Sequence, residues 1–222
     1  MAIYFAGYLS PIRNKLGNAV GRKWRTLDVL SVYNGRPRNP RTVAQQSTRM
    51  KFGTLANLAM SFSSAAKIGF KPMCDGTPIP ERSMFIRKNY DMVEVQMQDG
   101  RPVGTTVDYT EIVLAEGALP DAGWGNATFT NPLAVEVAMT DTSALPGALT
   151  TDKIILFVYS PEAGAGMLGQ EKVRDDDAIA VTVPTQWNGH RVHVWGMTYG
   201  APNTDNAGKV ANSRYLGSGT IQ

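Results

Sequence analysis

A basic, proline-containing segment that runs into a helix start is the feature that most constrains this chain. It occupies residues 35–52, GRPRNPRTVAQQSTRMKF. Pro37 and Pro40 fix their own φ angles and disfavour helix at the residues before them, so the chain should be extended up to Pro40. Thr42 precedes Gln45 by three residues, which is the Thr-x-x-Gln form of a capping box. The sequence therefore predicts a helix that begins directly after Thr42.

The apolar pattern after this cap has helical spacing. Side chains three and four apart form one stripe, and they are Val43, Met50, Leu55, Leu58, Phe62, Ala65 and Ala66. They predict a helix over about residues 43–68, either continuous for roughly seven turns or split into two. Gly53 is a candidate kink, and Gly69 is a candidate C-terminal stop.

The rest of the chain has the pattern of β-structure. Residues 71–80, KPMCDGTPIP, have the composition of a linker, and Val93, Val95 and Met97 then alternate before an Asp99-Gly100 turn. Further strands are predicted at residues 110–115, 133–139, 153–159, 178–183, 191–199 and 214–221. No amphipathic helix separates these strands, which favours antiparallel pairing over a parallel sheet.

Together these patterns predict an α+β, mainly β protein in three parts. Residues 1–72 form an extended basic arm with the helix, and residues 73–105 form a linker and the first strand. Residues 106–222 form an antiparallel, immunoglobulin-like β-sandwich.

Charge is distributed very unevenly along the chain. Residues 1–72 contain 12 Lys and Arg against the single acid Asp28, a net charge of +11. Residues 73–222 contain 10 Lys and Arg against 18 acids, a net charge of −8. A basic front and an acidic back are expected of a chain that docks on an anionic partner or on its own copies, although a solvated basic surface has the same composition.

Basic and aromatic residues are interleaved in the arm. The candidate partner-binding residues are Arg22, Lys23, Trp24, Arg25, Arg36, Arg38 and Arg41. In one interpretation these side chains contact phosphates while Trp24 stacks on a base. In the other, Trp24 and Tyr33 pack in the core and the arginines pair with acids of a neighbouring subunit. The sequence does not separate the two.

The N-terminal third resembles a family of uncharacterised proteins that is common in Bacteroidota genomes and their phages. The resemblance lies in GNAVGRKWRTLDVLSVYNGRPRNPRTVAQQSTRMKF and the following IGFKP, above all in Asn-Pro-Arg-Thr, Ala-Gln-Gln and the Arg and Phe after them. The later pieces VDYTEIVLAEGALP, DDDAIAVTVP and SRYLGSGTI are also similar. Such segments are similar to parts of tailed-phage structural proteins as well. The resemblance implies no catalytic residues.

No pattern in the sequence indicates catalysis. His190 and His193 are the only histidines and would point to opposite faces of a strand, and Cys74 has no partner thiol. We therefore expect no enzymatic activity, no cofactor and no metal. Nor does any apolar stretch reach the roughly 20 residues of a membrane span.

The expected function is that of a structural protein that self-assembles, as a component of a virion or a phage-related assembly. Its partners would be copies of itself or other virion proteins. The alternatives are a nucleic-acid-binding protein that uses the same arm, and a glycan- or receptor-binding module. The start, MAIYFAGYLSPIRNK, lacks the pattern of a secretion signal, which predicts a virion or cytoplasmic location.

Overall fold

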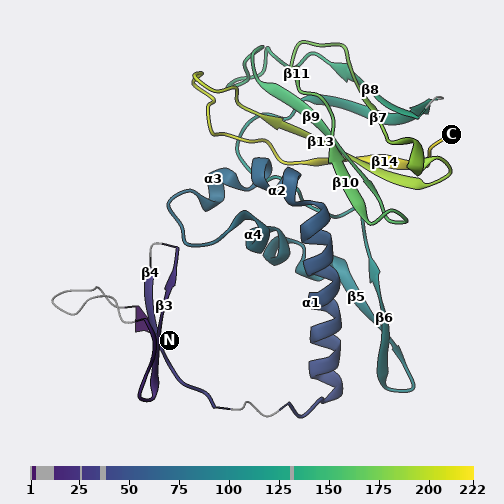
Figure 1. Ribbon diagram of the computed structural model, residues 1–222. Helices are drawn as coiled ribbons and strands as arrows, with labels where there is room; N and C mark the ends of the chain where they lie inside the picture. The colour runs from purple at the N-terminus through teal and green to yellow at the C-terminus, as the bar shows by residue number, and fades with distance from the viewer. Residues whose placement is uncertain (1, 4–12, 26, 36–38, 131–132) are drawn as a thin grey trace.

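The computed structural model describes residues 2–3, 13–25, 27–35, 39–130 and 133–222. Figure 1 shows three parts: a small N-terminal sheet, a group of helices with a β-hairpin, and a sandwich of two sheets. We call residues 2–32 the arm sheet, residues 33–42 the tether and residues 43–222 the body. The predicted class, α+β and mainly β, is confirmed, and the assignment to the immunoglobulin-like type stays a prediction.

The arm sheet is antiparallel and has few buried residues. Its strand order is β1 (Ala2–Ile3), β4 (Leu27–Val32), β3 (Ala19–Trp24) and β2 (Asn14–Leu16). Gly17 turns the chain between β2 and β3 with a φ of +59°, which glycine adopts without steric cost. Gly21 and Val29 are the buried residues among those described here. Because hydrophobic stabilisation scales with buried apolar area, such a sheet gains little stability from its own packing.

The predicted helix begins at the residue that the sequence indicates, and it is divided into two helices. α1 (Val43–Ser61) and α2 (Ser63–Gly69) meet at Phe62, whereas Gly53 does not interrupt α1. Phe62 is completely buried, so the break serves to insert its ring into the core. Gly69 ends α2 as predicted, and the structure adds a reason for glycine: a Cβ there would overlap the carbonyl oxygen of Leu114.

The predicted linker is folded. α3 (Lys71–Cys74) follows α2 directly, and α4 (Glu81–Lys88) and the short 3-10 helix η1 (Tyr90–Met92) fill most of the segment before the first body strand. A composition rich in Pro and Gly concealed these short helices, because Pro is tolerated in a first helical turn. The hairpin of β5 (Val93–Gln98) and β6 (Arg101–Val107) confirms the predicted strand and its Asp99-Gly100 turn, where both residues have positive φ.

Two antiparallel sheets form the sandwich. The first has the order β10-β9-β13-β14, with β11 also paired to β9, and the second has the order β12-β8-β7. The strands are β7 (Gly123–Thr130), β8 (Ala134–Thr140), β9 (Lys153–Ser160), β10 (Ala165–Leu168), β11 (Lys172–Val173), β12 (Ala178–Thr182), β13 (Arg191–Tyr199) and β14 (Arg214–Thr220). The short 3-10 helix η2 (Thr185–Trp187) precedes β13.

Most predicted sandwich strands are confirmed, and one is wrong. The predictions at residues 133–139, 153–159, 178–183, 191–199 and 214–221 correspond to β8, β9, β12, β13 and β14. Residues 110–115 form no strand, although Ile112, Leu114 and Ala115 are buried. Their alternation reflects packing of an irregular segment against the helices rather than pairing in a sheet. β7 escaped prediction because its glycines and polar residues weaken the strand pattern.

The body has three layers, because β9 is buried on both faces. Ile154, Leu156 and Val158 pack between the two sheets. The alternate residues of β9, among them Phe157 and Tyr159, pack against the helices. The helical cluster also contains Leu55, Phe85 and Trp195, so it joins residues from all three predicted parts. No described residue before Leu55 belongs to either cluster.

A buried ion pair holds the loops at one end of the sandwich. Arg174 and Asp152 are completely buried, with 3.3 Å between Nη2 and Oδ2. The Arg174 guanidinium also donates to the carbonyl oxygens of Pro120 (2.7 Å) and Asp121 (3.0 Å) and to Oγ1 of Thr142 (3.0 Å). Asp152 accepts from the Leu149 backbone N–H at 2.9 Å and from the Asn206 side chain at 3.0 Å. One arginine therefore ties together loops that are distant in sequence.

Candidate assembly interface

The arm sheet is attached to the body at its β3–β4 turn. Trp24 Nε1 donates to the Pro78 carbonyl oxygen at 3.1 Å. Arg25 Nη1 donates to the carbonyl oxygens of Thr77 (3.3 Å) and Ile79 (3.1 Å). We call these bonds, together with the ion pair between Arg25 and Glu81 described next, the arm contact. Its body side is the segment between α3 and α4, which the sequence predicted to be a linker.

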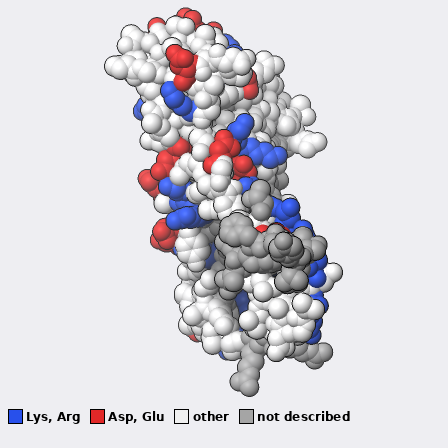
Figure 2. Space-filling model, turned by 90° about the vertical axis from the view of Figure 1, so that its left-hand side faces the viewer, with Lys and Arg blue, Asp and Glu red and all other residues white. Residues whose placement is uncertain are grey.

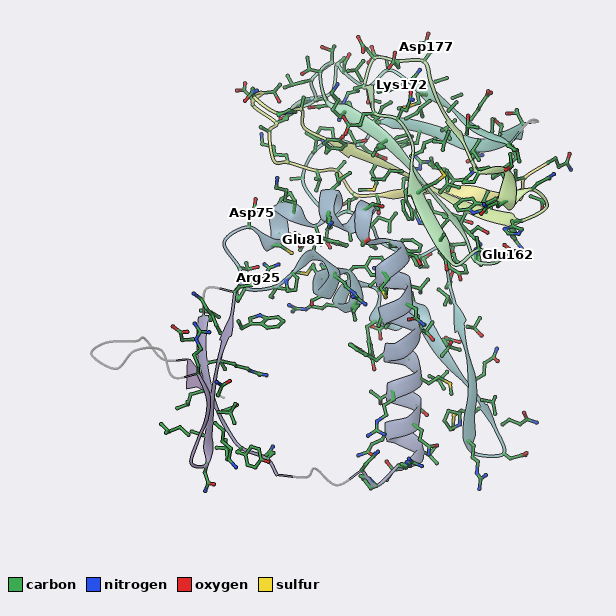
Figure 3. The ribbon with its side chains drawn as sticks, viewed as in Figure 1. Arg25, Asp75, Glu81, Glu162, Lys172 and Asp177 are labelled. Atoms are coloured by element: carbon green, nitrogen blue, oxygen red, sulfur yellow. The ribbon has the colours of Figure 1, made fainter. Side chains whose placement is uncertain are left out.

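Two acidic residues lie on the body side of Arg25. Its Nη2 lies 3.8 Å from Oε2 of Glu81, and Figure 3 shows Asp75 on the same side of the arm contact. The pKa of the Cys74 thiol is raised, first by burial and then by the Glu81 carboxylate, while the positive charge of Arg25 opposes this. Since the thiolate is the reactive form of cysteine, Cys74 is a buried structural thiol.

Arg25 adopts a backbone conformation that needs support. Its φ of +51° lies in the left-handed region, which costs a residue with a Cβ about 1–2 kcal/mol. Its three contacts to the body hold that conformation in place. About a third of each side chain of the Arg25–Glu81 pair is exposed, so the ion pair alone contributes at most about 1 kcal/mol. The hydrogen bonds to the carbonyl oxygens supply the geometric specificity.

The structure separates the predicted basic residues instead of gathering them into one patch. In the register of β3 with β2 and β4, Lys15, Arg22 and Trp24 lie on one face of the arm sheet, and Lys23 lies on the other. Arg25 points to the body, and Arg36 and Arg38 lie outside the described residues. Trp24 is 52% exposed, so it does not belong to the core.

Arg41 and Thr42 form the junction between the tether and α1. Thr42 is the N-cap, and its Oγ1 accepts from the Gln45 backbone N–H at 3.4 Å. In a capping box the Gln45 side chain would also accept from the Thr42 backbone N–H, but here it is the Gln46 side chain that reaches back, and it donates to the Arg41 carbonyl oxygen at 3.1 Å. Arg41 has a φ of +50°, so the chain turns sharply before the helix.

Exposed apolar side chains are concentrated in the arm and in the adjoining part of the body. Of the ten large apolar side chains exposed among the described residues, only Leu145 lies in the sandwich. The others precede residue 108 and are Leu16, Trp24, Val32, Tyr33, Val43, Phe52, Met60, Met97 and Val103. Monomeric proteins rarely leave such side chains in contiguous patches, which mark interaction sites.

Two of these groups form recognisable surfaces. On the arm sheet Leu16 pairs with Ala19 and Ala19 pairs with Val32, so the three side chains form one row across a face. Leu16 is 64% exposed and Val32 is 75% exposed. On the body, Phe52 and Ile86 line a hollow of about 530 Å³ between α1 and α4. We call these the arm row and the α1–α4 hollow.

One polar cluster in the sandwich has the composition of a hydrolytic site but not its geometry. Ser160 Oγ lies 3.2 Å from Nδ1 of His190 and 3.3 Å from Oε2 of Glu162. Ser160 is completely buried and also accepts from the Ala163 backbone N–H, so its hydroxyl has no access to a substrate. The carboxylate contacts the serine rather than the imidazole, unlike a catalytic triad. The cluster therefore supports the β9–β10 turn.

His193 is held neutral in the aromatic part of the helical core. Its Nδ1 lies 2.9 Å from the Tyr215 hydroxyl, and its ring stacks on Tyr109 with 4.4 Å between centroids. Burial, together with the positive charge of Arg191, lowers the pKa of His193 to about 4. Among the described residues, no group of His, Cys, Asp and Glu is arranged to hold a metal ion, and no helix is long and apolar enough to cross a membrane.

Residues 11–217 match the model of a family of unknown function, DUF6266. The chain belongs to this family. The match runs through β2, β3 and β4, the tether and nearly all of the body, so these three strands of the arm sheet are part of the DUF6266 unit. The chain matches no curated protein.

Sequence reasoning missed two parts of this interface. The mixture of basic and aromatic residues identified Trp24 and Arg25 as candidate binding residues. Residues 77–81, which they contact, have only a turn-forming composition, so the sequence did not predict that they form a contact surface. The α1–α4 hollow was also missed, because Phe52 lies outside the predicted apolar stripe and Ile86 belongs to a helix that the sequence did not predict.

Proposed function

We propose that this chain is a structural protein that assembles with copies of itself, as a component of a virion or a phage-related particle. The observation that carries the proposal is the concentration of exposed apolar side chains in the arm, α1 and the β5–β6 hairpin, while the sandwich has well-buried cores. The virion part rests on the resemblance of the N-terminal motif to tailed-phage structural proteins.

The distribution of charge also favours contact between neighbouring copies. The +11 of residues 1–72 and the −8 of residues 73–222 make the two parts of neighbouring copies attractive to each other. Figure 2 shows acidic side chains at the top of the sandwich and basic ones along an edge of the lower half, near the arm. A homo-oligomer held in this way would weaken at high salt, because exposed charges are screened beyond about 10 Å at 0.1 M ionic strength.

Light scattering coupled to size-exclusion chromatography tests the proposal. We expect the full chain to form oligomers in a concentration-dependent manner and the chain without residues 1–41 to be monomeric. Deletion should leave the body folded, since no described residue before Leu55 belongs to its cores. A full chain that stays monomeric at every concentration and salt would contradict the proposal.

Two matched substitutions locate the surface. Val32→Asp places a charge in the exposed arm row, and Leu145→Asp places one on the exposed surface of the sandwich. We expect the first to weaken assembly and the second to leave it unchanged, with both chains as stable as the wild type. Equal effects of the two substitutions would argue against an interface at the arm row.

Nucleic-acid binding is a second candidate, favoured by the arm's charge. Residues 1–42 contain eight Lys and Arg against one acid, and Lys15 and Lys23 are exposed. A protein that contacts phosphates with several such side chains binds tightly at low salt and loses affinity steeply as salt rises. Failure of the full chain to retard DNA or RNA in a gel at low salt would exclude this candidate.

A further inference from the structure

We infer that the arm is exchanged between two copies of the chain, so that Trp24 and Arg25 of one copy form the arm contact with residues 77–81 of the other. The inference rests on the proposed function and specifies its partner, a second copy, and the residues through which the two copies meet. In Figure 1 the arm sheet reaches the body at the end that carries the β3–β4 turn.

The arm contact can form between chains as well as within one. It consists of hydrogen bonds from two side chains to three backbone carbonyl oxygens, and one ion pair. None of these groups is buried in a core shared by the arm sheet and the body. An exchanged arm therefore retains every bond of the arm contact, as is usual when identical elements are exchanged between protomers.

The tether is long enough for exchange. Ten residues, 33–42, join β4 to α1, and a chain of that length spans up to about 35 Å. Its described residues form no helix or strand. The arm sheet can therefore dock at different places relative to α1 without disturbing the arm sheet or the body.

Exchange also gains surface that a single chain leaves uncovered. The arm row and the α1–α4 hollow are both exposed within one copy. These surfaces are available for contacts with a second copy, and each Å² of apolar surface that such contacts remove from water contributes about 25 cal/mol. The basic arm of each copy then faces the acidic part of the other. A second copy thus satisfies both the apolar and the charge requirements.

Charge reversal of the ion pair distinguishes contact within a chain from contact between chains. Arg25→Glu leaves two carboxylates facing each other, and Glu81→Arg leaves two guanidinium groups. Each single variant loses the ion pair and, for Arg25→Glu, two hydrogen bonds as well, so we expect its dimerisation to weaken by about 10- to 100-fold. The assay is light scattering on full-length chains over a range of concentrations.

The decisive sample is an equal mixture of the two single variants. If the arms are exchanged, the arm of the Glu81→Arg chain meets a native Glu81, and the arm of the Arg25→Glu chain meets an arginine. We therefore expect the mixture to recover dimers that neither variant forms alone at the same total concentration. The double variant, Arg25→Glu with Glu81→Arg, restores opposite charges in every arrangement and serves as the control for folding.

Two outcomes would overturn the inference. The first is a mixture that forms no more dimer than either single variant while the double variant dimerises, because the arm contact then forms within each chain. The second is single variants that dimerise like the wild type. In each case the wild-type chain still forms oligomers, whereas failure of the proposed function appears as a monomeric wild type.

Discussion

The buried pair of Arg174 and Asp152 allows a quantitative prediction for Arg174→Met. Methionine keeps most of the aliphatic stem but removes the ion pair and the bonds to Pro120, Asp121 and Thr142. Breaking a buried pair by removing one partner costs about 3–5 kcal/mol, because the remaining charge is uncompensated. Asp152 keeps its bonds from Leu149 and Asn206, which places the expected loss near the lower limit. The three acceptors that lose the arginine as their donor, at about 1 kcal/mol each, also give a loss of about 3 kcal/mol.

Urea denaturation followed by circular dichroism measures this loss. We expect the free energy of unfolding to fall by about 3 kcal/mol, and the melting temperature to fall by about 6–12 °C for a chain of this size. Lys172→Met is the matched control: Lys172 is an exposed residue whose Nζ donates to the Ala178 carbonyl oxygen, and its loss should change stability by no more than about 0.5 kcal/mol.

A second substitution tests the reason for the loss. If the unpaired Asp152 carboxylate is responsible, Asp152→Asn combined with Arg174→Met should be less destabilised than the sum of the single variants, because the isolated charge is gone. An Arg174→Met protein that loses less than about 1 kcal/mol would refute the claim that this buried arginine holds the loops together.

Three further predictions concern other parts of the chain. In urea denaturation Gly69→Ala should destabilise the protein by about 1–3 kcal/mol, because the added Cβ overlaps the Leu114 carbonyl oxygen. Gly53→Ala has open space for its Cβ and should stabilise the protein by about 0.5–1 kcal/mol. The reverse order of stabilities would contradict this account of the packing around the two glycines. His193 should lower the free energy of unfolding by about 3 kcal/mol as the pH falls from 6.5 to 4, because only the unfolded chain binds a proton at this residue in that range. The His193→Gln variant should lack this pH dependence in denaturation experiments. A variant with the same pH profile as the wild type would contradict the prediction. Thr42→Ala should lower the free energy of unfolding by at most about 1 kcal/mol, because the capping bond is long, and a loss above 2 kcal/mol would mean that Thr42 does more than cap.

The sequence was most informative where local chemistry decides the structure. The start of α1 follows from Thr42, and the β5–β6 turn follows from Asp99 and Gly100, since both depend on residues adjacent in the chain. Strand β9 was predicted at residues 153–159. Its burial on both faces, however, depends on packing against helices that precede it by some 90 residues, and no local pattern predicts that packing.

Features built from distant residues could not be predicted. Arg174 and Asp152 each lie in a polar segment that is typical of a solvated loop, and only the folded chain brings the two side chains together. The same holds for Arg25 and Glu81. Residues 110–115 show the opposite error, because an alternating pattern there records burial under the helices and not a strand.

Helix α1 also sets a length scale. Its 19 residues extend about 28 Å, and the β5–β6 hairpin lies beside it, joined by a 2.8 Å hydrogen bond between the Thr54 and Thr105 hydroxyls. At its far end Phe62 is held by the rings of Phe157 and Tyr159 in the central sheet, at 4.8 and 4.7 Å. The helix is thus a rigid connection, with one end anchored in the sandwich through Phe62 and the other end joined to the tether. Tension on an arm that has left the arm contact would therefore pass through the tether and α1 to Phe62 and its contacts with β9.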